Sequence, residues 1–300
     1  MMNDDYSLLD SGDGRKLERF GRYVIARPCS QAVWRPALPA SAWSKADASF
    51  DRTDGNQWHN RGALPKEWRI SVAGITFKLS GTDFGHLGIF PEQRAQWQWI
   101  RETVKSRGSI LLPKVAGASC SRTVGEQDAP PTIHVLNLFA YSGGATMAAA
   151  LGGAAVCHLD ASKGMVQWAR ENAALNNLQD RPIRWIDDDA HKFLHREIRR
   201  GNRYDAIILD PPTFGRGQNN EMYKIERDLP ETLSLCKQLL SPTPLFILLS
   251  AHTPGFSPTV LQNVLAQSMG GGHCTCGEML LTGAEGVLPT PSGTWARWTA

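Results

Sequence analysis

Residues 205–214, with the sequence DAIILDPPTF, constrain the fold of this chain more than any other stretch. The first half is an apolar run of strand length with β-branched residues, which is typical of a strand buried on both faces of a parallel sheet. Pro211 and Pro212 end this strand, because they lack backbone N–H groups and push the preceding residue towards an extended conformation. We therefore predict that Asp210 lies at the carboxyl end of a buried strand, with the ring of Phe214 a few residues beyond.

That position favours a binding site. In open α/β sheets, ligands bind in the crevice outside the carboxyl ends of the strands. Asp210 and Phe214 bring a rigid carboxylate and an aromatic platform to this crevice. The same residue types also form proline-stiffened turns that only end a strand, so this stretch alone leaves both interpretations open.

The composition is that of a folded protein without a membrane helix. The chain has 300 residues, of which 42% are hydrophobic and 20% charged, enough for one large domain or two smaller ones. No apolar segment approaches the ~20 residues that a membrane helix needs. The first five residues are polar and acidic, unlike a secretory signal or a transit peptide, so we expect a cytoplasmic protein.

Neither metal binding nor nucleic-acid binding follows from composition alone. Cys274 and Cys276 are the only closely spaced cysteines, and they lack the C-x-x-C spacing of a structural zinc site. We therefore predict reduced, mostly structural cysteines and no metal. The net charge of +3 is too small to indicate a nucleic-acid partner, and the arginine cluster within residues 196–203 is typical of a solvated helix end.

The first 90 residues predict a small β-rich domain. Residues 70–79 alternate between polar and apolar side chains, as in a half-buried antiparallel strand. Tryptophan is dense in this region and suits core packing, our preferred interpretation, or stacking on bases. Residues 91–131 connect this domain to the rest of the chain through a helix that starts at Pro91 and a linker at 113–131, to which we assign no function.

From residue 132 to residue 300 the sequence alternates between strands and helices. We expect buried strands at 133–139, 154–159, 183–186, 204–209 and 245–249. We expect helices at 145–151, after Ser162, at 190–200, at 222–240 and at 258–269, and a closing strand pair at 274–281 and 294–299. This alternation predicts an α/β fold with a doubly wound, Rossmann-like sheet and right-handed crossovers.

Successive strands of this sheet end in loops suited to one ligand. Gly143 and Gly144 follow the first strand and let the backbone approach a ligand closely. The turn lacks the G-x-G-x-x-G pattern of dinucleotide binding and a P-loop lysine, which argues against a phosphate ligand. Asp160 follows the second strand, where a carboxylate commonly accepts hydrogen bonds from both hydroxyls of a ribose.

The third strand ends in three aspartates that suit an adenine or a helix cap. Asp188 and Asp189 can accept hydrogen bonds from the exocyclic amine of an adenine, whereas for Asp187 we prefer the role of helix cap. Each residue alone is equally well explained as a cap, and only the ordered set is specific. A nucleoside without phosphates fits these three loops, and S-adenosylmethionine is such a ligand.

The same segments resemble a known family. Residues 135–144 (VLNLFAYSGG), residues 158–165 (HLDASKGM), the aspartate run and residues 210–214 closely resemble the class I S-adenosylmethionine-dependent methyltransferases. Within them, the chain is most similar to the bacterial group that modifies bases of large-subunit ribosomal RNA. Residues 9–21 and 88–94 also look like that group, so the resemblance covers most of the chain. It is specific for fold and cofactor and less so for the substrate.

The resemblance implies a role for each residue of the site. It places the methionine end of S-adenosylmethionine among Phe139, Tyr141, Gly143 and Gly144, the ribose on Asp160, and the adenine near Ser162 and Asp188 or Asp189. It also implies that Gln93 and Arg94 approach the cofactor from the loop before the connecting helix, and that Asp210 faces the methyl group.

The chemistry of methyl transfer agrees with the Asp-Pro-Pro motif. An exocyclic amine of a base is a poor nucleophile, because its lone pair is delocalised into the ring. Asp210 and the Pro211 carbonyl can accept its N–H groups and localise that pair, while Phe214 stacks on a base swung out of its RNA context. Transfer from a sulfonium then needs mainly positioning, and no metal is required.

The chain lacks a cysteine where methylation at C5 of cytosine would need a nucleophile. Members of the group that carry out this reaction look to have one after the fifth strand, where this chain has Ser250, Ala251 and His252. Cys236 lies in a predicted helix and is interpreted as a core thiol. We therefore predict transfer to a base nitrogen, and for His252 either a substrate contact or a structural role.

The sequence thus predicts an S-adenosylmethionine-dependent methyltransferase acting on a base nitrogen of RNA. Ribosomal RNA is the favoured acceptor, and the β-rich domain is expected to help hold it. A protein glutamine amide, a DNA base and a small molecule are the alternative acceptors, because an amide nitrogen poses the same lone-pair problem. An alternative of another class is a non-catalytic RNA-binding assembly factor whose cofactor site is only structural.

Overall fold

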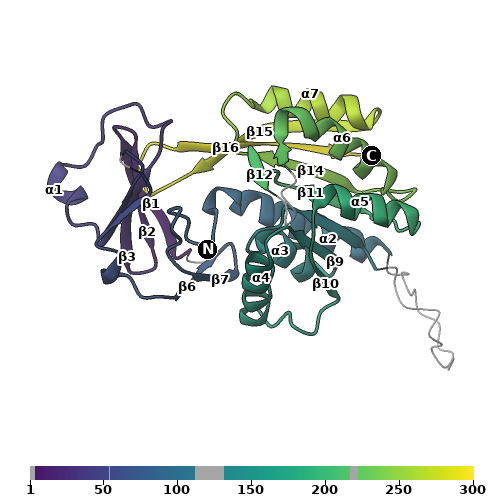
Figure 1. Ribbon diagram of the computed structural model, residues 1–300, viewed down its shortest axis with the longest axis horizontal. Helices are drawn as coiled ribbons and strands as arrows, with labels where there is room; N and C mark the ends of the chain where they lie inside the picture. Colours follow the sequence, from purple (N-terminus) through teal and green to yellow (C-terminus); the bar gives the residue numbers. More distant parts are fainter. Residues whose placement is uncertain (1–3, 54, 112–131, 217–221) are drawn as a thin grey trace.

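The structure is a computed structural model that describes residues 4–53, 55–111, 132–216 and 222–300. The predicted linker at 113–131 lies outside these residues. Figure 1 shows an α/β part on one side of the molecule and, on the other, a β-rich part built from the first strands of the chain. Strands near the carboxyl terminus, drawn in yellow, extend from the α/β part towards the β-rich part.

A seven-stranded sheet forms the centre of the α/β part, with the strand order β10-β9-β8-β11-β14-β16-β15. The parallel strands are β8 (His134–Leu138), β9 (Ala155–Asp160), β10 (Ile183–Asp187), β11 (Ala206–Leu209) and β14 (Phe246–Ala251). β16 (Thr290–Thr299) runs antiparallel to β14 and to β15 (His273–Leu281). The predicted doubly wound fold is confirmed, and its switch point lies between β8 and β11.

Helices cover both faces of this sheet. On one face, α2 (Arg94–Leu111), α3 (Gly144–Leu151) and α4 (Lys163–Leu175) share a buried cluster with the strands. On the other face, α5 (Ala190–Arg199), α6 (Ile225–Gln238) and α7 (Pro258–Met269) share a second cluster. Successive side chains of β11 enter the two clusters in turn, which explains its unbroken apolar sequence. Among the described residues, no helix combines the length and the apolar composition that crossing a membrane demands.

Two helices begin later than the sequence predicts. The chain at Pro91–Gln93 forms a short 3-10 turn, η2, before α2 begins. The start predicted at residue 222 is wrong, because Met222–Lys224 (β13) pairs with Phe214–Arg216 (β12) in an antiparallel hairpin. The Asp228 carboxylate accepts a hydrogen bond from the Lys224 N–H (2.7 Å) and thereby satisfies the amide that precedes α6.

The β-rich part contains a five-stranded sheet and a separate hairpin. Its strands follow chain order and are β1 (Tyr6–Gly12), β2 (Arg15–Phe20), β3 (Tyr23–Pro28), β4 (Ala48–Asp51) and β5 (Gln57–His59), with the short elements α1 (Ala40–Trp43) and η1 (Arg61–Ala63) between or after them. The single strand predicted at 70–79 is wrong: β6 (Trp68–Val72) and β7 (Ile75–Leu79) form a hairpin. Ala73 and Gly74 both have positive φ (52° and 72°), as a two-residue hairpin turn requires.

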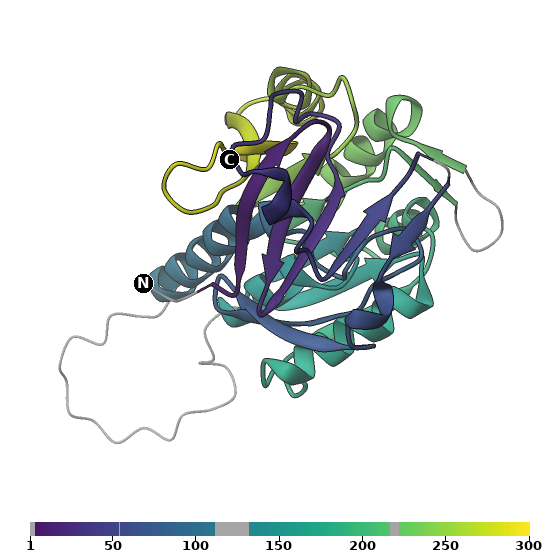
Figure 2. The same cartoon turned by 90° about the vertical axis from the view of Figure 1, so that its left-hand side faces the viewer.

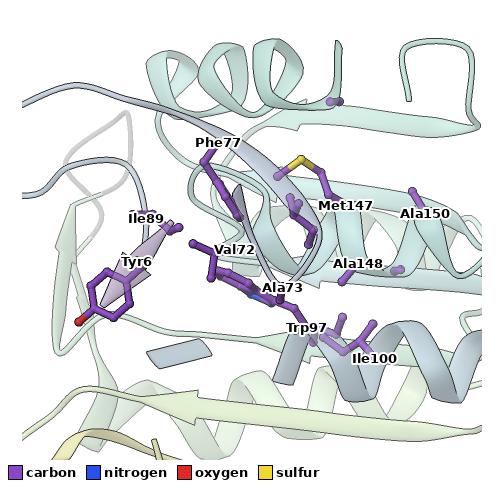
Figure 3. Packing of buried hydrophobic residues seen from close by; sticks show 14 of the residues in the cluster. Tyr6, Val72, Ala73, Phe77, Ile89, Trp97, Ile100, Met147, Ala148 and Ala150 are labelled. Atoms are coloured by element: carbon purple, nitrogen blue, oxygen red, sulfur yellow. The ribbon is translucent and has the colours of Figure 1, made fainter. Parts of the chain in front are cut away.

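One buried hydrophobic cluster connects the β-rich part to the α/β part. It runs from Tyr6 of β1 through Phe77 of β7 to Trp97 of α2 and Met147 of α3, as Figure 3 shows. At the carboxyl end, the Thr290 hydroxyl donates a buried hydrogen bond to the Ser11 hydroxyl of β1 (2.7 Å). Figure 2, which views the molecule from the β-rich side, shows the purple strands in front of the α/β sheet.

Buried His158 of β9 makes the stability of the fold depend on pH. Its Nδ1 atom hydrogen-bonds to the Thr146 hydroxyl (2.9 Å), and burial lowers the pKa of the ring to about 3 from the usual 6.5. Between these values the unfolded chain binds a proton that the folded protein does not. We therefore expect this residue to lower the free energy of unfolding as the pH falls through this range, by up to about 1.4 kcal/mol per pH unit.

Two measurements check this pH dependence. Urea unfolding at a series of pH values below neutral should show the loss of stability. An NMR titration of the His158 ring in the folded protein should show no protonation at pH values well above 3. A ring that takes up its proton near pH 6.5 while the protein remains folded would contradict the assignment.

Candidate active site

A cleft of about 580 Å³ lies outside the carboxyl ends of the parallel strands, between the α/β part and the β-rich part. The α/β part lines it with residues that follow β8, β9, β10, β11 and β14. The facing wall consists of side chains from the β-rich part, and a loop before α2 closes one side. The lining residues used below are Lys16, Arg27, Phe50, Arg52, His86, Phe90, Glu92, Phe139, Tyr141, Asp160, Ser162, Asp188, Asp189, Asp210, Pro211, Tyr223 and His252.

The loop after β8 reaches the cleft through a strained backbone. Phe139 and Tyr141 have positive φ (54° and 48°), an uncommon conformation that costs about 1–3 kcal/mol per residue and persists where surrounding contacts enforce it. Here the Tyr141 N–H donates to the Asp160 carboxylate (2.8 Å), and the Ala140 N–H donates to the Leu159 carbonyl (3.0 Å). The strain and these bonds together turn the two aromatic side chains into the cleft.

The two glycines of this loop are required by packing and by backbone shape. Gly143 has a φ of 90° and lies against Ala169, whereas a Cβ atom at Gly144 would come within 2.7 Å of the Trp97 ring. Gly144 therefore allows α3 to pack closely on α2. Gly144 and Gln93 line a small adjoining cavity of about 50 Å³ that shares Phe139, Tyr141 and Asp210 with the cleft, and Gly143 lines neither cavity.

Asp160 ends β9 and joins two loops of the cleft. Its carboxylate accepts hydrogen bonds from the backbone N–H groups of Tyr141 (2.8 Å) and Ser162 (2.9 Å). Burial raises the pKa of this carboxyl, and the two N–H groups offset part of that rise. Ser162 caps α4, because its hydroxyl accepts the Met165 N–H (3.4 Å).

The aspartates after β10 divide their roles differently from the prediction. The helix cap is Asp189 and not Asp187: α5 begins at Ala190, and the Asp189 carboxylate accepts the Lys192 N–H (2.9 Å). Asp188 forms an ion pair with Arg196 (2.5 Å) and accepts the Asp189 N–H (2.8 Å). Both Asp188 and Asp189 nevertheless line the cleft.

Asp210 follows β11 and has one carboxylate oxygen without a partner. The Gln93 side-chain amide donates to its Oδ2 atom (3.2 Å) and also to the Ser250 hydroxyl (3.0 Å). Oδ1 is buried and accepts no hydrogen bond from the described residues. Asp210 therefore keeps unused acceptor capacity where it lines the cleft.

Besides Gly143, two residues of the predicted site line neither the cleft nor the adjoining cavity, namely Arg94 and Phe214. Arg94 is directed elsewhere, because its guanidinium binds the Thr282 hydroxyl and forms an ion pair with Asp4 (3.5 Å). The Phe214 side chain is 47% exposed and does not line the cleft, although its neighbours Thr213 and Gly215 do. Phe214 therefore lies next to the cleft rather than inside it.

Two aromatic residues that were not predicted as site residues, Phe90 and Tyr223, also line the cleft. Phe90 packs against Tyr141, with 5.1 Å between ring centroids, and Tyr223 packs against Phe139 at the same distance. Phe90 belongs to residues 88–94, which resemble the family, so that resemblance could have indicated its place in the site. Tyr223 was assigned to a helix, and only the β12–β13 pairing brings it to the cleft.

Comparisons with known proteins agree with this geometry. A family model described as S-adenosylmethionine-dependent methyltransferase matches residues 117–264. The SAM-dependent methyltransferase from Agrobacterium tumefaciens is 37% identical, with a TM-score of 0.86, and the match covers 99% of this chain and 91% of that one. The chain belongs to the S-adenosylmethionine-dependent methyltransferases. The predicted family and its cofactor are therefore confirmed.

More distant relatives of this methyltransferase share its fold or part of its sequence. A putative SAM-dependent methyltransferase from Streptococcus mutans has a TM-score of 0.72 at 17% identity, covering 99% of this chain and 75% of that one. The protein named Ribosomal RNA large subunit methyltransferase K/L of Shewanella oneidensis is 32% identical over 189 residues, which are 62% of this chain and 22% of that protein. The chain thus spans about a fifth of the length of such curated relatives.

The cleft of this methyltransferase fits S-adenosylmethionine in size and chemistry. Ligand sites commonly measure about 300–1,000 Å³, and this cleft lies within that range. Asp160 is anchored by backbone N–H groups alone, so each of its oxygens retains a lone pair for a hydroxyl of the ligand. Phe90, Phe139, Tyr141 and Tyr223 bring aromatic side chains to the cleft, and Asp210 lines both the cleft and the adjoining cavity.

Proposed function

We propose that this methyltransferase transfers a methyl group from S-adenosylmethionine to a base nitrogen of ribosomal RNA. The observation that carries the proposal is the Asp210 carboxylate at the cleft, which Gln93 holds in place and which retains acceptor capacity for the N–H group of an acceptor amine. The names of the curated relatives support ribosomal RNA as the acceptor. A cytoplasmic location, where bacterial ribosomal RNA is made, is part of this proposal.

The residues that line the cleft suggest where the cofactor binds. We assign the ribose to Asp160, the adenine to Ser162 with Asp188 and Asp189, and the methionine end to Phe139, Tyr141, Gly144 and Gln93. S-adenosylmethionine supplies a methyl group on a positively charged sulfur, which leaves as a neutral thioether. The protein's task is then to hold the acceptor in line with that group.

Asp210 and Pro211 are assigned to the acceptor amine. Both line the cleft, and the Gln93 amide fixes the Asp210 carboxylate by donating to Oδ2. Oδ2 accepts this one hydrogen bond and retains a lone pair for the N–H group of the acceptor. Acceptance of the N–H bonds keeps the nitrogen lone pair out of the base ring and directs it towards the methyl group.

The wall from residues 1–90 is proposed to contact the RNA backbone. Buried Glu18 forms ion pairs with Arg27 (2.7 Å) and with Lys16 (3.4 Å). The two cations and one carboxylate leave this cluster with a net positive charge. Arg52 stacks over the Phe50 ring, with 5.9 Å to the ring centroid. A basic wall facing the acids of residues 132–300 favours an anionic polymer over a neutral amide as the acceptor.

Replacing Arg52 by Gln tests this wall. We expect weaker binding of ribosomal RNA and a slope of log Kd against log salt that is smaller by about 1, because one phosphate contact is lost. Arg22→Gln is a matched control on the same sheet, since Arg22 is exposed and does not line the cleft. Equal salt slopes for the two variants would show that Arg52 makes no such contact.

Methyl transfer itself tests the proposed function. Labelled S-adenosylmethionine is incubated with this protein and ribosomal RNA from cells that lack it, and the product nucleosides are analysed. We expect a labelled N-methyl base. Label in a protein or DNA fraction, but not in RNA, would support one of the alternative acceptors, and cofactor binding without transfer to any fraction would favour a non-catalytic factor.

A further inference from the structure

His252 lies beside Asp210 at the cleft, just after the neighbouring strand. β11 leads into Asp210 and β14 ends at Ala251, and the two strands are adjacent and parallel. The Nε2 atom of His252 lies 3.8 Å from Oδ2 of Asp210. Both side chains line the cleft, and 33% of the His252 side chain is exposed. His252 is therefore placed to reach the group that Asp210 binds.

Hydrogen bonding assigns the hydrogen of the neutral His252 ring to Nδ1. This atom lies 2.7 Å from the Ser292 carbonyl oxygen, and a carbonyl can only accept. The neutral ring therefore carries its lone pair on Nε2, the nitrogen next to Asp210. Phe90 packs against the ring, with 5.4 Å between centroids. Ser292, whose carbonyl binds Nδ1, is itself fixed because its hydroxyl donates to the Glu92 carboxylate (2.8 Å).

Two acceptors thus face each other across a short gap. The Asp210 carboxylate and Nε2 of the neutral His252 ring both accept hydrogen bonds, and 3.8 Å is longer than a hydrogen bond between them. Oδ2 accepts one hydrogen bond from Gln93 and retains a further lone pair. Acceptors on two sides of one space suit a nitrogen with two N–H bonds, one for each acceptor. The exocyclic amine of a base is such a group.

We propose that His252 accepts the proton that the acceptor nitrogen releases when it is methylated. The inference rests on the proposed function. The nitrogen lone pair forms a bond to the methyl carbon, and the carbon–sulfur bond breaks with its electron pair remaining on sulfur. The methylated nitrogen then carries a positive charge and loses one N–H proton to Nε2 of His252. The resulting imidazolium lies beside the Asp210 carboxylate and returns its proton to solvent.

Two carboxylates lie close to the His252 ring. Asp210 lies 3.8 Å from Nε2, and Glu92, on the turn before α2, lies 3.8 Å from Nδ1. His86 also packs against Phe90, and a positive charge on its ring would oppose an imidazolium at His252. Burial and the charges of Arg27 and Arg52 lower the pKa of His86 to about 4, so His86 stays neutral at physiological pH.

Replacing His252 by Asn tests whether the residue accepts a proton or only supports the structure of the cleft. The asparagine amide can still donate to the Ser292 carbonyl, but it has no basic nitrogen. We expect single-turnover methyl transfer into ribosomal RNA to fall by about 100-fold or more. We also expect the decline of the rate on acidification, which protonation of a histidine causes in the wild type, to disappear. The Kd values for cofactor and RNA should stay unchanged.

Two further variants complete the experiment. His252→Ala leaves space for the lost ring, so added imidazole should restore part of the transfer rate. His195→Asn is the matched control, because His195 is an exposed histidine on α5 that does not line the cleft, and it should keep the rate and pH profile of the wild type.

The outcomes distinguish the inference from the proposed function. Wild-type rate and pH profile in His252→Asn would overturn the inference and leave the proposed function intact. A slower variant that keeps the wild-type pH profile would also overturn it, because His252 would then only position the substrate. A wild-type protein that binds the cofactor but transfers no methyl group to RNA would overturn the proposed function and the inference with it.

Discussion

Replacing Asp210 by Ala is expected to lower the rate of methyl transfer by about 100- to 1,000-fold, the usual effect of removing one preorganised polar group at a reacting centre. Asp210 lines the cleft, and its loss removes the carboxylate that we propose accepts the N–H group of the substrate. Single-turnover transfer of labelled methyl groups measures the rate, and calorimetry measures the cofactor affinity. We expect the rate to fall far more than the affinity.

Asp210→Asn is the matched control for shape. The amide has nearly the same size, and its oxygen can still accept the Gln93 N–H group that now reaches Oδ2 (3.2 Å). Its nitrogen then takes the place of Oδ1 and presents N–H groups to the acceptor amine, so we expect transfer to fail in a folded protein. Substantial transfer by Asp210→Asn would show that the carboxylate charge is not required.

Replacing Asp160 by Ala is expected to weaken binding of S-adenosylmethionine by about 100-fold or more, because the carboxylate is proposed to bind two ribose hydroxyls and a hydrogen bond to a charged group contributes about 1.5–3 kcal/mol. The same carboxylate accepts the N–H groups of Tyr141 and Ser162, so its loss also frees two loops of the cleft. Calorimetric titration with the cofactor measures the effect. Asp180→Ala, at an exposed aspartate before β10, should bind like the wild type.

Acidification should reproduce part of the Asp160 effect. Burial raises the pKa of this carboxyl, so in the free protein it takes up a proton at a higher pH than an exposed aspartate does. The protonated form is a weaker acceptor for the ribose hydroxyls, and affinity should fall as the pH decreases. In Asp160→Ala this part of the pH dependence should vanish. If wild type and variant lose affinity in parallel, another group is responsible.

The alternation of strands and helices was predictable from the sequence because its signals are local. The parallel strands are short apolar runs, and α4, α5 and α7 each begin after a side-chain cap. The helix predicted at 258–269 coincides with α7 for this reason: Ser257 supplies the cap and Pro258 suits the first turn. The positions of Asp160 and Asp210 were predictable too. Asp160 is the last residue of β9 and Asp210 follows β11, so both lie at the carboxyl ends of parallel strands.

The failures of prediction share a different origin. The reversal at Ala73 and Gly74 was missed, because both arms of the β6–β7 hairpin carry the same alternation as one long strand. Asp189 became the cap in place of Asp187, because β10 extends through Asp187 by pairing with β9. In both cases the pairing of one strand with another sets the bounds of the element. The alternation of apolar and polar residues within a strand does not specify its partner.

By itself, the sequence determined the order of the elements and the acids at the strand ends, because backbone propensity and side-chain period act over neighbouring residues. Only the tertiary structure decided which side chains face the cleft. It turned Arg94 towards Thr282, left Phe214 beside the cleft, and brought His252 to 3.8 Å from Asp210. These placements depend on packing between elements far apart in the chain, where contacts and not spacing set the direction of a side chain.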